Sequence, residues 1–409
     1  MISGINTTFQ RHRSVMHLRR PILFALTFTV MSGCGGSDNN GLSLAEQEAQ
    51  AVATIFERDR ERIIEQLALD VIPQGYEALA EETTALRLAA TEFCANPSSI
   101  ALNDLRASWG DAKSQHAFTQ AMEFGEPVND LDGSANQTRA RRLYISDVAD
   151  SQLSSRITQL IQGDVEITEA MVASSNITNQ GFQALEYVLF GAEGIAENPP
   201  VVADFSGSLN ADRRCDYVVA ATQNLDTIAN AIRTDWAGET SDFPNQFITA
   251  GNGSTVYADR ATALDDVFSV VNSLVQVMRD DRLGDVIESQ RPSDAETWRS
   301  AHSLENFQNN LAGLRAVYSG GSGYGADDFY SVTIGENIGE QGIQITFDDV
   351  ESGIDLVFDP FSTAVVTEFG RIRLGILQGA TAELASLLEE RIFTTVTGNS
   401  ADFNFNDGD

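Results

Sequence analysis

The sequence predicts an all-α protein built from two packed helical bundles. Apolar residues recur at spacings of three and four along most of the chain, which is the pattern of an α-helix with one buried face. Strand signals are sparse: one short run at 343–347 alternates apolar and polar residues, and a single run does not make a sheet. A loop-rich stretch at 237–254 divides the helical segments into two groups, each large enough for a four-helix-type bundle.

The first 33 residues indicate an export signal rather than part of the fold. Four arginines, with no acidic residue among them, precede an apolar run at 21–31 that is too short to span a bilayer. The run leads into Met31-Ser32-Gly33-Cys34, which resembles the lipobox of bacterial lipoproteins. We expect Cys34 to be diacylated and residues 34–43 to form a flexible tether. The bilayer is then a partner, and the protein is lipid-anchored at the periplasmic face or the surface of the bacterial outer membrane. An ordinary signal peptide with an incidental cysteine is the alternative.

The helices predicted after the tether fall on either side of the 237–254 linker. The N-terminal bundle spans 44–236 and the C-terminal bundle spans 255–409. Pro73 ends the first helix, and a glycine-rich loop at about 319–328 interrupts the second bundle. We predict helices at 45–72 and 75–93, and at about 100–123, 138–162, 165–173, 178–190, 210–236, 255–282, 303–318 and 362–395.

Composition and charge exclude one class of partner. The chain has 409 residues with 59 acidic and 26 basic side chains, which gives a formal net charge of −33. A surface this acidic repels polyphosphate, so nucleic acid is not an expected partner. Apolar residues at 42% and charged residues at 21% are typical of a globular protein with a core.

The cysteines indicate one disulfide. With Cys34 bound to lipid, Cys94 and Cys215 remain as an even pair in an oxidising compartment. We predict a bridge between them. Two buried free thiols are the alternative.

A segment in the middle of the chain carries a family resemblance. Residues 181–191, Gly-Phe-Gln-Ala-Leu-Glu-Tyr-Val-Leu-Phe-Gly, resemble the signature helix of the imelysin family, in which GxHxxE precedes an aromatic and apolar run. Other pieces resemble the family in the expected order: 70–76, Trp109, 124–127, 213–217, 303–304, 309–314, Tyr318 and 407–409. Together these matches cover nearly the whole chain beyond the export signal.

The resemblance implies a two-domain, all-helical lipoprotein or periplasmic protein tied to iron acquisition. It implies a metal ion, iron or another divalent cation, as cofactor, and iron-transport components as partners. Some family members are described as metallopeptidases. Its site lies around the signature helix, near the junction of the bundles, and the matched positions imply Gly181, Gln183, Glu186, Ser303 and Asn310 as binding residues.

The chain departs from the family pattern at the decisive position, because Gln183 stands where the family has His. A His and a Glu three residues apart project from one helix face and can share a metal. An amide oxygen is a poor zinc ligand and a mediocre iron ligand. Beyond the export signal only His116 and His302 remain; we expect the first to pack between helices and the second to lie in a capping region. A zinc hydrolase is therefore not supported.

Glu186 interrupts the apolar stripe of its own helix and needs a partner. One interpretation is an interhelical ion pair with Arg142 or Arg213. The other is a cleft-lining carboxylate to which Glu123 and Asp147 add oxygens, an oxygen-only metal site that favours Ca²⁺, Mg²⁺ or a ferric species. In that case Glu186 is buried against polar groups and Gln183 reaches the same cluster.

Ser303 at a helix start is better explained as an N-cap than as a nucleophile. Three functions then remain. The favoured one is a non-catalytic, metal-binding or iron-uptake lipoprotein with an interdomain site. The others are a metallopeptidase and a structural or partner-docking lipoprotein.

Overall fold

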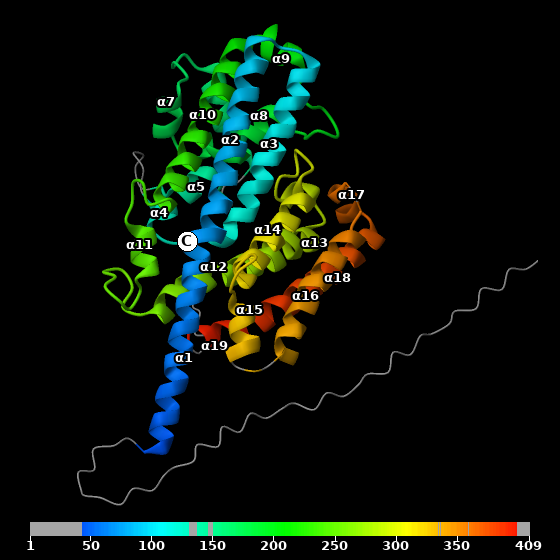
Figure 1. Cartoon of the computed structure of the whole chain (residues 1–409). Coiled ribbons are helices and arrows are strands. Elements are labelled where there is room, and N and C mark those ends of the chain that lie inside the picture. Colours follow the sequence, from blue (N-terminus) through cyan, green and yellow to red (C-terminus); the bar gives the residue numbers. More distant parts are fainter. Residues whose placement is uncertain are drawn as a thin grey trace, which may run out of the picture. The chain divides into compact units, whose positions relative to one another are not determined.

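Every described residue in regular secondary structure lies in a helix, which confirms the predicted all-α fold (Figure 1). The computed structural model describes residues 43–130, 137–145, 150–333, 335, 337–358 and 360–398. Cys34, Asp147 and the export signal lie outside these residues. Ala49–Asp409 forms one compact unit, and Met1–Glu48 is assigned to another. The division of the longer unit into two bundles stays a prediction.

Three long helices form the centre of the N-terminal group. α2 (Ile72–Ala95) packs against both α3 (Ser99–Thr119) and α10 (Ala211–Trp236) (Figure 1). Pro73 does not end a helix as predicted, because it lies in the first turn of α2, where its missing N–H needs no partner. A π-helical turn, η1 (Leu67–Val71), instead joins α1 (Leu44–Gln66) to α2.

Short elements complete this group. α8 packs against α3, α5, α6 and α10. The elements are η2 (Gln120–Met122), α4 (Glu126–Asn129), α5 (Arg139–Leu143), α6 (Asp150–Gln162), α7 (Glu169–Ser174), η3 (Ile177–Asn179), α8 (Gly181–Phe190), α9 (Val202–Ser206) and α11 (Phe243–Ile248).

The C-terminal group is built on α12, α14, α16 and α18. α18 packs against both α12 and α16. The elements are α12 (Arg260–Arg279), η4 (Asp280–Asp285), α13 (Val286–Ser289), η5 (Pro292–Asp294), α14 (Ser303–Ser319), α15 (Ala326–Asp328), η6 (Phe329–Thr333), α16 (Asn337–Leu356), α17 (Phe361–Val366), α18 (Glu368–Leu387), η7 (Leu388–Phe393) and α19 (Thr394–Val396).

α16 is a helix that the sequence analysis missed. Its buried residues Ile343, Phe347, Val350 and Ile354 follow spacings of four and three. The alternation at 343–347 masked this period, because Ile345, two positions after the buried Ile343, is also apolar although it is exposed.

The contact between α3 and α14 joins the two groups and positions the candidate site. Gly313 on α14 makes the close approach possible, since a Cβ there would lie 2.1 Å from the carbonyl oxygen of Phe118 on α3. α14 also packs against α12.

The predicted disulfide is confirmed. Cys94 on α2 and Cys215 on α10 are bridged, with their Cα atoms 5.6 Å apart. The bridge spans a sequence separation of 121 residues across the α2–α10 contact.

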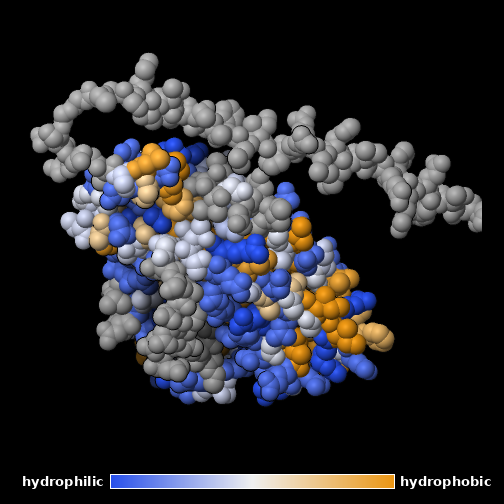
Figure 2. Space-filling view, turned by 90° about the horizontal axis from the view of Figure 1, so that it is seen from below, coloured by the Kyte–Doolittle hydropathy of each residue, from blue (hydrophilic) through white to orange (hydrophobic). Residues whose placement is uncertain are grey.

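The surface shown in Figure 2 is mostly hydrophilic, as the acidic composition predicts, and apolar side chains form separate patches. Among the described residues, no helix combines the length and the apolar character needed to cross a membrane.

Candidate functional site

The signature helix α8 is held in place by close backbone contacts. Gly181 opens it with a φ of +79°, and a Cβ at this position would lie 2.5 Å from the carbonyl oxygen of Leu143. Trp109 on α3 donates its indole N–H to the carbonyl oxygen of Phe182, at 3.2 Å. Gly181 therefore serves the packing of α8 on α5.

Glu186 lies on the buried side of α8 and is only 2% exposed. One carboxylate oxygen accepts hydrogen bonds from the Ser300 backbone N–H at 2.9 Å and from the Ser300 hydroxyl at 2.8 Å. Burial raises the pKa of Glu186 to about 7, against the lowering effects of these two bonds and of the Arg299 and Lys113 charges. Glu186 is thus buried against polar groups, as expected for a site residue.

The two arginines proposed as ion-pair partners of Glu186 bind elsewhere. Arg142 donates to the side chains of Gln180 and Asn224, at 3.1 and 2.9 Å. Arg213 donates to the carbonyl oxygen of Ile161, among other backbone oxygens, at 2.9 Å. The ion-pair interpretation with either arginine is therefore wrong.

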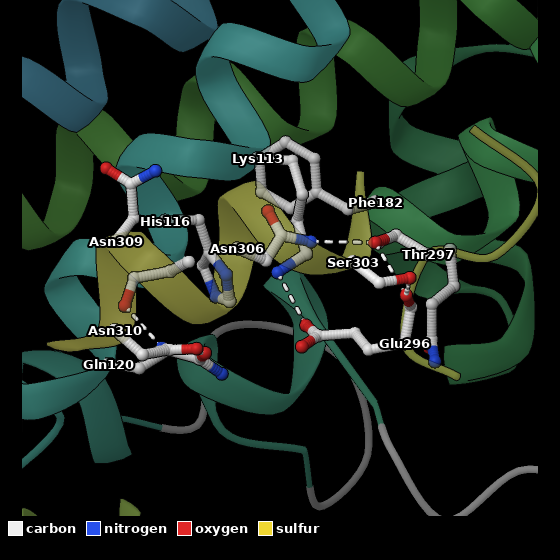
Figure 3. Close-up of polar contacts among 12 residues, drawn as sticks. Lys113, His116, Gln120, Phe182, Glu296, Thr297, Ser303, Asn306, Asn309 and Asn310 are labelled. Carbon is white, nitrogen blue, oxygen red and sulfur yellow. Dashed lines mark hydrogen bonds and ion pairs between the residues drawn. The ribbon is translucent and has the colours of Figure 1, made fainter. Parts of the chain in front are cut away.

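A strained loop brings Ser300 to Glu186. Thr297 and Ala301 have φ values of +50° and +64°, in the left-handed region that residues with a Cβ rarely adopt. Asn306 on α14 holds Thr297 by donating its amide to the Thr297 hydroxyl, at 2.8 Å (Figure 3). Strain of this kind is found at functional sites more often than elsewhere. We name residues 295–302 the site loop.

The site loop also carries Glu296, which joins two cations. Lys113 Nζ lies 2.8 Å from one carboxylate oxygen of Glu296 (Figure 3). Arg282 Nε lies 2.9 Å from the other carboxylate oxygen. Burial alone would raise the pKa of Glu296, but Arg282 and Lys113 outweigh it and lower the pKa to about 2. Sequence reasoning missed this pair; its one signal is that Lys113 is the only lysine in the chain.

Asn310 connects the network to the end of α3. Its amide donates to the carbonyl oxygen of Ala117 at 2.7 Å and to the side chain of Gln120 at 2.9 Å. Arg282 donates to the Asn310 side-chain oxygen and, at 3.0 Å, to Gln120. The predicted site residue Asn310 is thus part of the buried polar cluster.

Ser303 has a different role from the expected N-cap. His302 occupies the N-cap position of α14 without a side-chain capping bond, and the Ser303 hydroxyl donates to the carbonyl oxygen of Glu296. Ser303 therefore fastens the site loop to α14.

His116 and Glu123 lie next to each other at the end of α3. His116 is fully buried, and its Nε2 is 3.5 Å from a Glu123 carboxylate oxygen. Neither ring nitrogen has a hydrogen-bond partner among the described residues. Burial and the Lys113 charge lower the pKa of His116 well below its ordinary value, whereas burial raises the pKa of Glu123 to about 7.

Gln183 does not reach Glu186 and its partners in the way we expected. Its side-chain oxygen accepts a hydrogen bond from the backbone N–H of Ile145, at 3.3 Å. Three carboxylates were predicted to bind metal. The positive charge of Lys113 acts on two of them, Glu186 and Glu123, and lowers the pKa of each. No group of three or more His, Cys, Asp or Glu residues in the described part of the chain is arranged to hold a metal ion. Asp147 lies outside that part.

Two surface hollows lie away from this cluster. One, of about 410 Å³, follows α6 along Ser151 and Gln159. The other, of about 490 Å³, lies at the end of α8 and is lined by residues that include Tyr187, Asn198 and Arg214. Neither is lined by Glu186 or Glu123.

Comparison with known proteins extends the resemblance to most of the chain. The family model described as Imelysin matches residues 72–388. Iron-regulated protein A of Synechococcus elongatus is 22% identical over 406 residues, which cover 96% of this chain and 97% of that protein.

Two solved structures share the fold. An imelysin-like protein from Psychrobacter arcticum 273-4 aligns with a TM-score of 0.65 at 16% identity, covering 85% of this chain and 98% of that one. A putative iron-regulated protein A precursor from Parabacteroides distasonis aligns with a TM-score of 0.66 at 15% identity, covering 84% and 95%. Because the family model spans most of the chain and includes both α8 and the α3–α14 contact, the chain belongs to the imelysin family.

Proposed function

We propose that this protein is a non-catalytic, lipid-anchored binding protein of an iron-uptake system, and that its buried polar cluster binds a metal ion or a metal chelate. The observation that carries the proposal is the state of two carboxylates. Glu186 is only 2% exposed and accepts hydrogen bonds from Ser300, but it has no ion-pair partner among the described residues. Glu123 faces His116, whose ring nitrogens have no hydrogen-bond partner there. Burial also raises the pKa of both carboxyl groups to about 7, and a bound cation would favour their charged forms.

The basic side chains near Glu186 form ion pairs with other carboxylates. Lys113 and Arg282 both bind Glu296. Arg299 forms an ion pair with Asp150. In the part of the chain that the structure describes, no basic side chain forms an ion pair with Glu186, which relies on the two bonds from Ser300. A bound metal ion would therefore supply Glu186 with the positive charge that no ion-pair partner supplies.

The residues present fit a cation only in part. Glu186, Glu123 and the unpartnered imidazole of His116 supply the donor types that iron and similar ions accept. These three side chains are not arranged as one metal-binding group among the described residues, and Asp147 remains a proposed further donor. The bound ion would supply positive charge to the cluster, and the chain's own residues would orient and bury it.

The link to iron comes from the relatives. One similar chain is named iron-regulated protein A, and a solved structure of the same fold is a putative precursor of such a protein. These names support a role in iron acquisition for the present chain, with iron-transport components as partners.

A non-catalytic role is favoured by the signature helix itself. Gln183 supplies a neutral amide whose oxygen is already bound to the Ile145 N–H, so α8 presents no His and Glu pair to polarise a peptide bond. The metallopeptidase function, which some family members are described to have, remains the main alternative.

The test is metal analysis of the full-length chain purified without chelator after growth in iron-containing medium. We expect iron or another transition metal close to one per chain in the parent protein and a clear loss in Glu186→Gln. Glu305→Gln, which changes an exposed carboxylate on α14, is the matched control and should retain metal. Equal metal contents in the parent and in Glu186→Gln, or none in either, would contradict the proposal.

A further inference from the structure

The imidazole of His116 is the least explained polar group in the cluster. The side chain is fully buried, and both ring nitrogens lack a hydrogen-bond partner among the residues described. Buried polar atoms without partners are rare in folded proteins and mark a missing ligand, an ordered water or a functional constraint. A ring that only filled space would be better served by an apolar residue.

The chain turns so that a carboxylate faces this ring. Glu123 is seven residues beyond His116, and in a straight α-helix two such residues lie about 10 Å apart along the axis. The 3-10 turn η2 ends the helix early, and Tyr76 fixes the turn by donating its hydroxyl to the carbonyl oxygen of Met122, at 3.0 Å. Glu123 is thereby placed with an oxygen 3.5 Å from His116 Nε2.

That separation suits two ligands of one metal ion. Transition metals bind imidazole nitrogen and carboxylate oxygen at about 2.0–2.2 Å, so two such ligands at tetrahedral or octahedral angles lie about 3.0–3.6 Å apart. We propose that His116 Nε2 and a Glu123 carboxylate oxygen are two protein ligands of a first-row transition dication. Water or a chelate fills the remaining positions and connects the ion to Glu186. This assignment rests on the proposed function and names its ligands.

Two aromatic side chains hold the His116 ring in position. It packs against Phe182 and Tyr144, with centroid distances of 5.3 and 5.9 Å (Figure 3 shows His116 and Phe182). Lys113 and Arg282 both lie near the two ligands, and their positive charges would repel a metal ion. Both are, however, bound to Glu296, with Lys113 Nζ at 2.8 Å and Arg282 Nε at 2.9 Å from its carboxylate oxygens. Lys113 Nζ also lies 4.6 Å from the centre of the Tyr144 ring.

A nitrogen ligand changes the expected metal. The oxygen-only set considered from the sequence favours Ca²⁺, Mg²⁺ or a ferric species. Imidazole instead favours iron, cobalt, nickel or zinc. The imidazole that the family places at position 183 on α8 is, in this chain, provided from α3, where its ring rests on Phe182.

The experiment is titration of the full-length chain with Co²⁺, followed by visible absorption and calorimetry, with Ca²⁺ as the comparison ion. We expect His116→Phe to weaken Co²⁺ binding by at least about tenfold, because losing a ligand costs no less than losing a residue that orients one. Phenylalanine keeps the packing and removes both unpartnered nitrogens. Glu305→Gln, which changes an exposed carboxylate on α14 outside the site loop, is the control and should bind Co²⁺ as the parent does.

The outcomes separate this inference from the proposed function. If the parent and His116→Phe bind Co²⁺ equally and Glu186→Gln binds weakly, the cluster binds metal without His116 and the inference is wrong. If none of them binds, the proposed function fails as well. Nitrogen-15 NMR of the histidine rings needs no variant: Zn²⁺ should shift one nitrogen of the buried ring, and an unchanged spectrum for that ring would overturn the assignment.

Discussion

Glu186 on α8 and Ser300 in the site loop are joined by two hydrogen bonds, one from the Ser300 backbone N–H at 2.9 Å and one from its hydroxyl at 2.8 Å. They connect helices of the N-terminal group to a loop of the C-terminal group. The same carboxylate has a pKa raised to about 7 by burial. The contact therefore joins α8 to the site loop. It also buries a carboxyl group that has no ion-pair partner among the described residues.

The first prediction concerns pH. The pKa of Glu186 is about 7 in the folded protein, against an ordinary 4.5. Between these values the folded state holds a proton that the unfolded state has lost, so stability falls as pH rises from 4.5 to 7. The contribution of Glu186 is roughly 3 kcal/mol. Urea unfolding of the metal-free protein at pH 5 and pH 7.5 measures it.

Glu186→Gln is the control for this pH effect. It keeps an oxygen for Ser300 and cannot ionise, so its stability should change less between the two pH values. Glu296 does not confuse the comparison, because its pKa of about 2 makes it titrate below this range. An identical pH dependence in the parent and in Glu186→Gln would show that the burial of this carboxylate does not control stability.

The second prediction concerns the ion pairs of Glu296. Glu296→Gln leaves both Lys113 and Arg282 without their carboxylate, and we expect a loss of about 3–5 kcal/mol. Lys113→Met should cost less, because Arg282 still neutralises Glu296. Unfolding by urea ranks the two variants, and the opposite ranking would refute the described division of charge.

The third prediction concerns the strained site loop. Ala301 has a φ of +64°, which favours glycine, so Ala301→Gly should stabilise the protein by about 1 kcal/mol. Ala53→Gly, at an exposed position inside α1, is the matched control and should destabilise by about 0.5–1 kcal/mol. Calorimetric melting temperatures distinguish the two; a destabilising Ala301→Gly would mean that the loop is not strained there.

The fourth prediction concerns the disulfide. Replacing both Cys94 and Cys215 by serine should lower the free energy of unfolding by about 2–5 kcal/mol, because the unfolded chain regains the freedom that the bridge removes. Adding a reductant to the parent protein should give a similar loss. If the variant and the parent unfold at the same urea concentration, the bridge does not stabilise the fold.

The fifth prediction separates binding from peptidase activity. We expect no peptide hydrolysis by the parent chain with or without Zn²⁺, because Gln183 is neutral and bound to Ile145. Gln183→His restores the family's His and Glu spacing on α8 and should raise affinity for a transition metal, measured by calorimetry. Zinc-dependent hydrolysis by the parent would support the metallopeptidase alternative instead.

The sequence predicted the features that depend on local period and composition. The long helices α2, α3, α10 and α12 follow apolar spacing, and the disulfide was predicted from a count of cysteines together with the expectation of an oxidising compartment. The family assignment also follows from residues that can be read in order. α16 was missed because its helical period coincides with a short alternating run.

The partners of the site residues could not be predicted in the same way. Ser300 and Glu296 lie in a loop whose path depends on left-handed residues such as Thr297, and nothing in a threonine indicates that conformation. Arginines were the expected partners of Glu186, because the sequence does not indicate that the backbone N–H of Ser300 reaches its carboxylate. Lys113 is different, because it is the single lysine of the chain and that rarity could have marked it as a site residue.

The most direct test of metal binding at the cluster is an anomalous-scattering map of crystals grown with Co²⁺ and collected on both sides of the cobalt edge. We predict one strong peak within bonding distance of Glu123 or Glu186, between α3, α8 and the site loop. Peaks confined to exposed carboxylates, with none in the cluster, would contradict a metal-binding role for it.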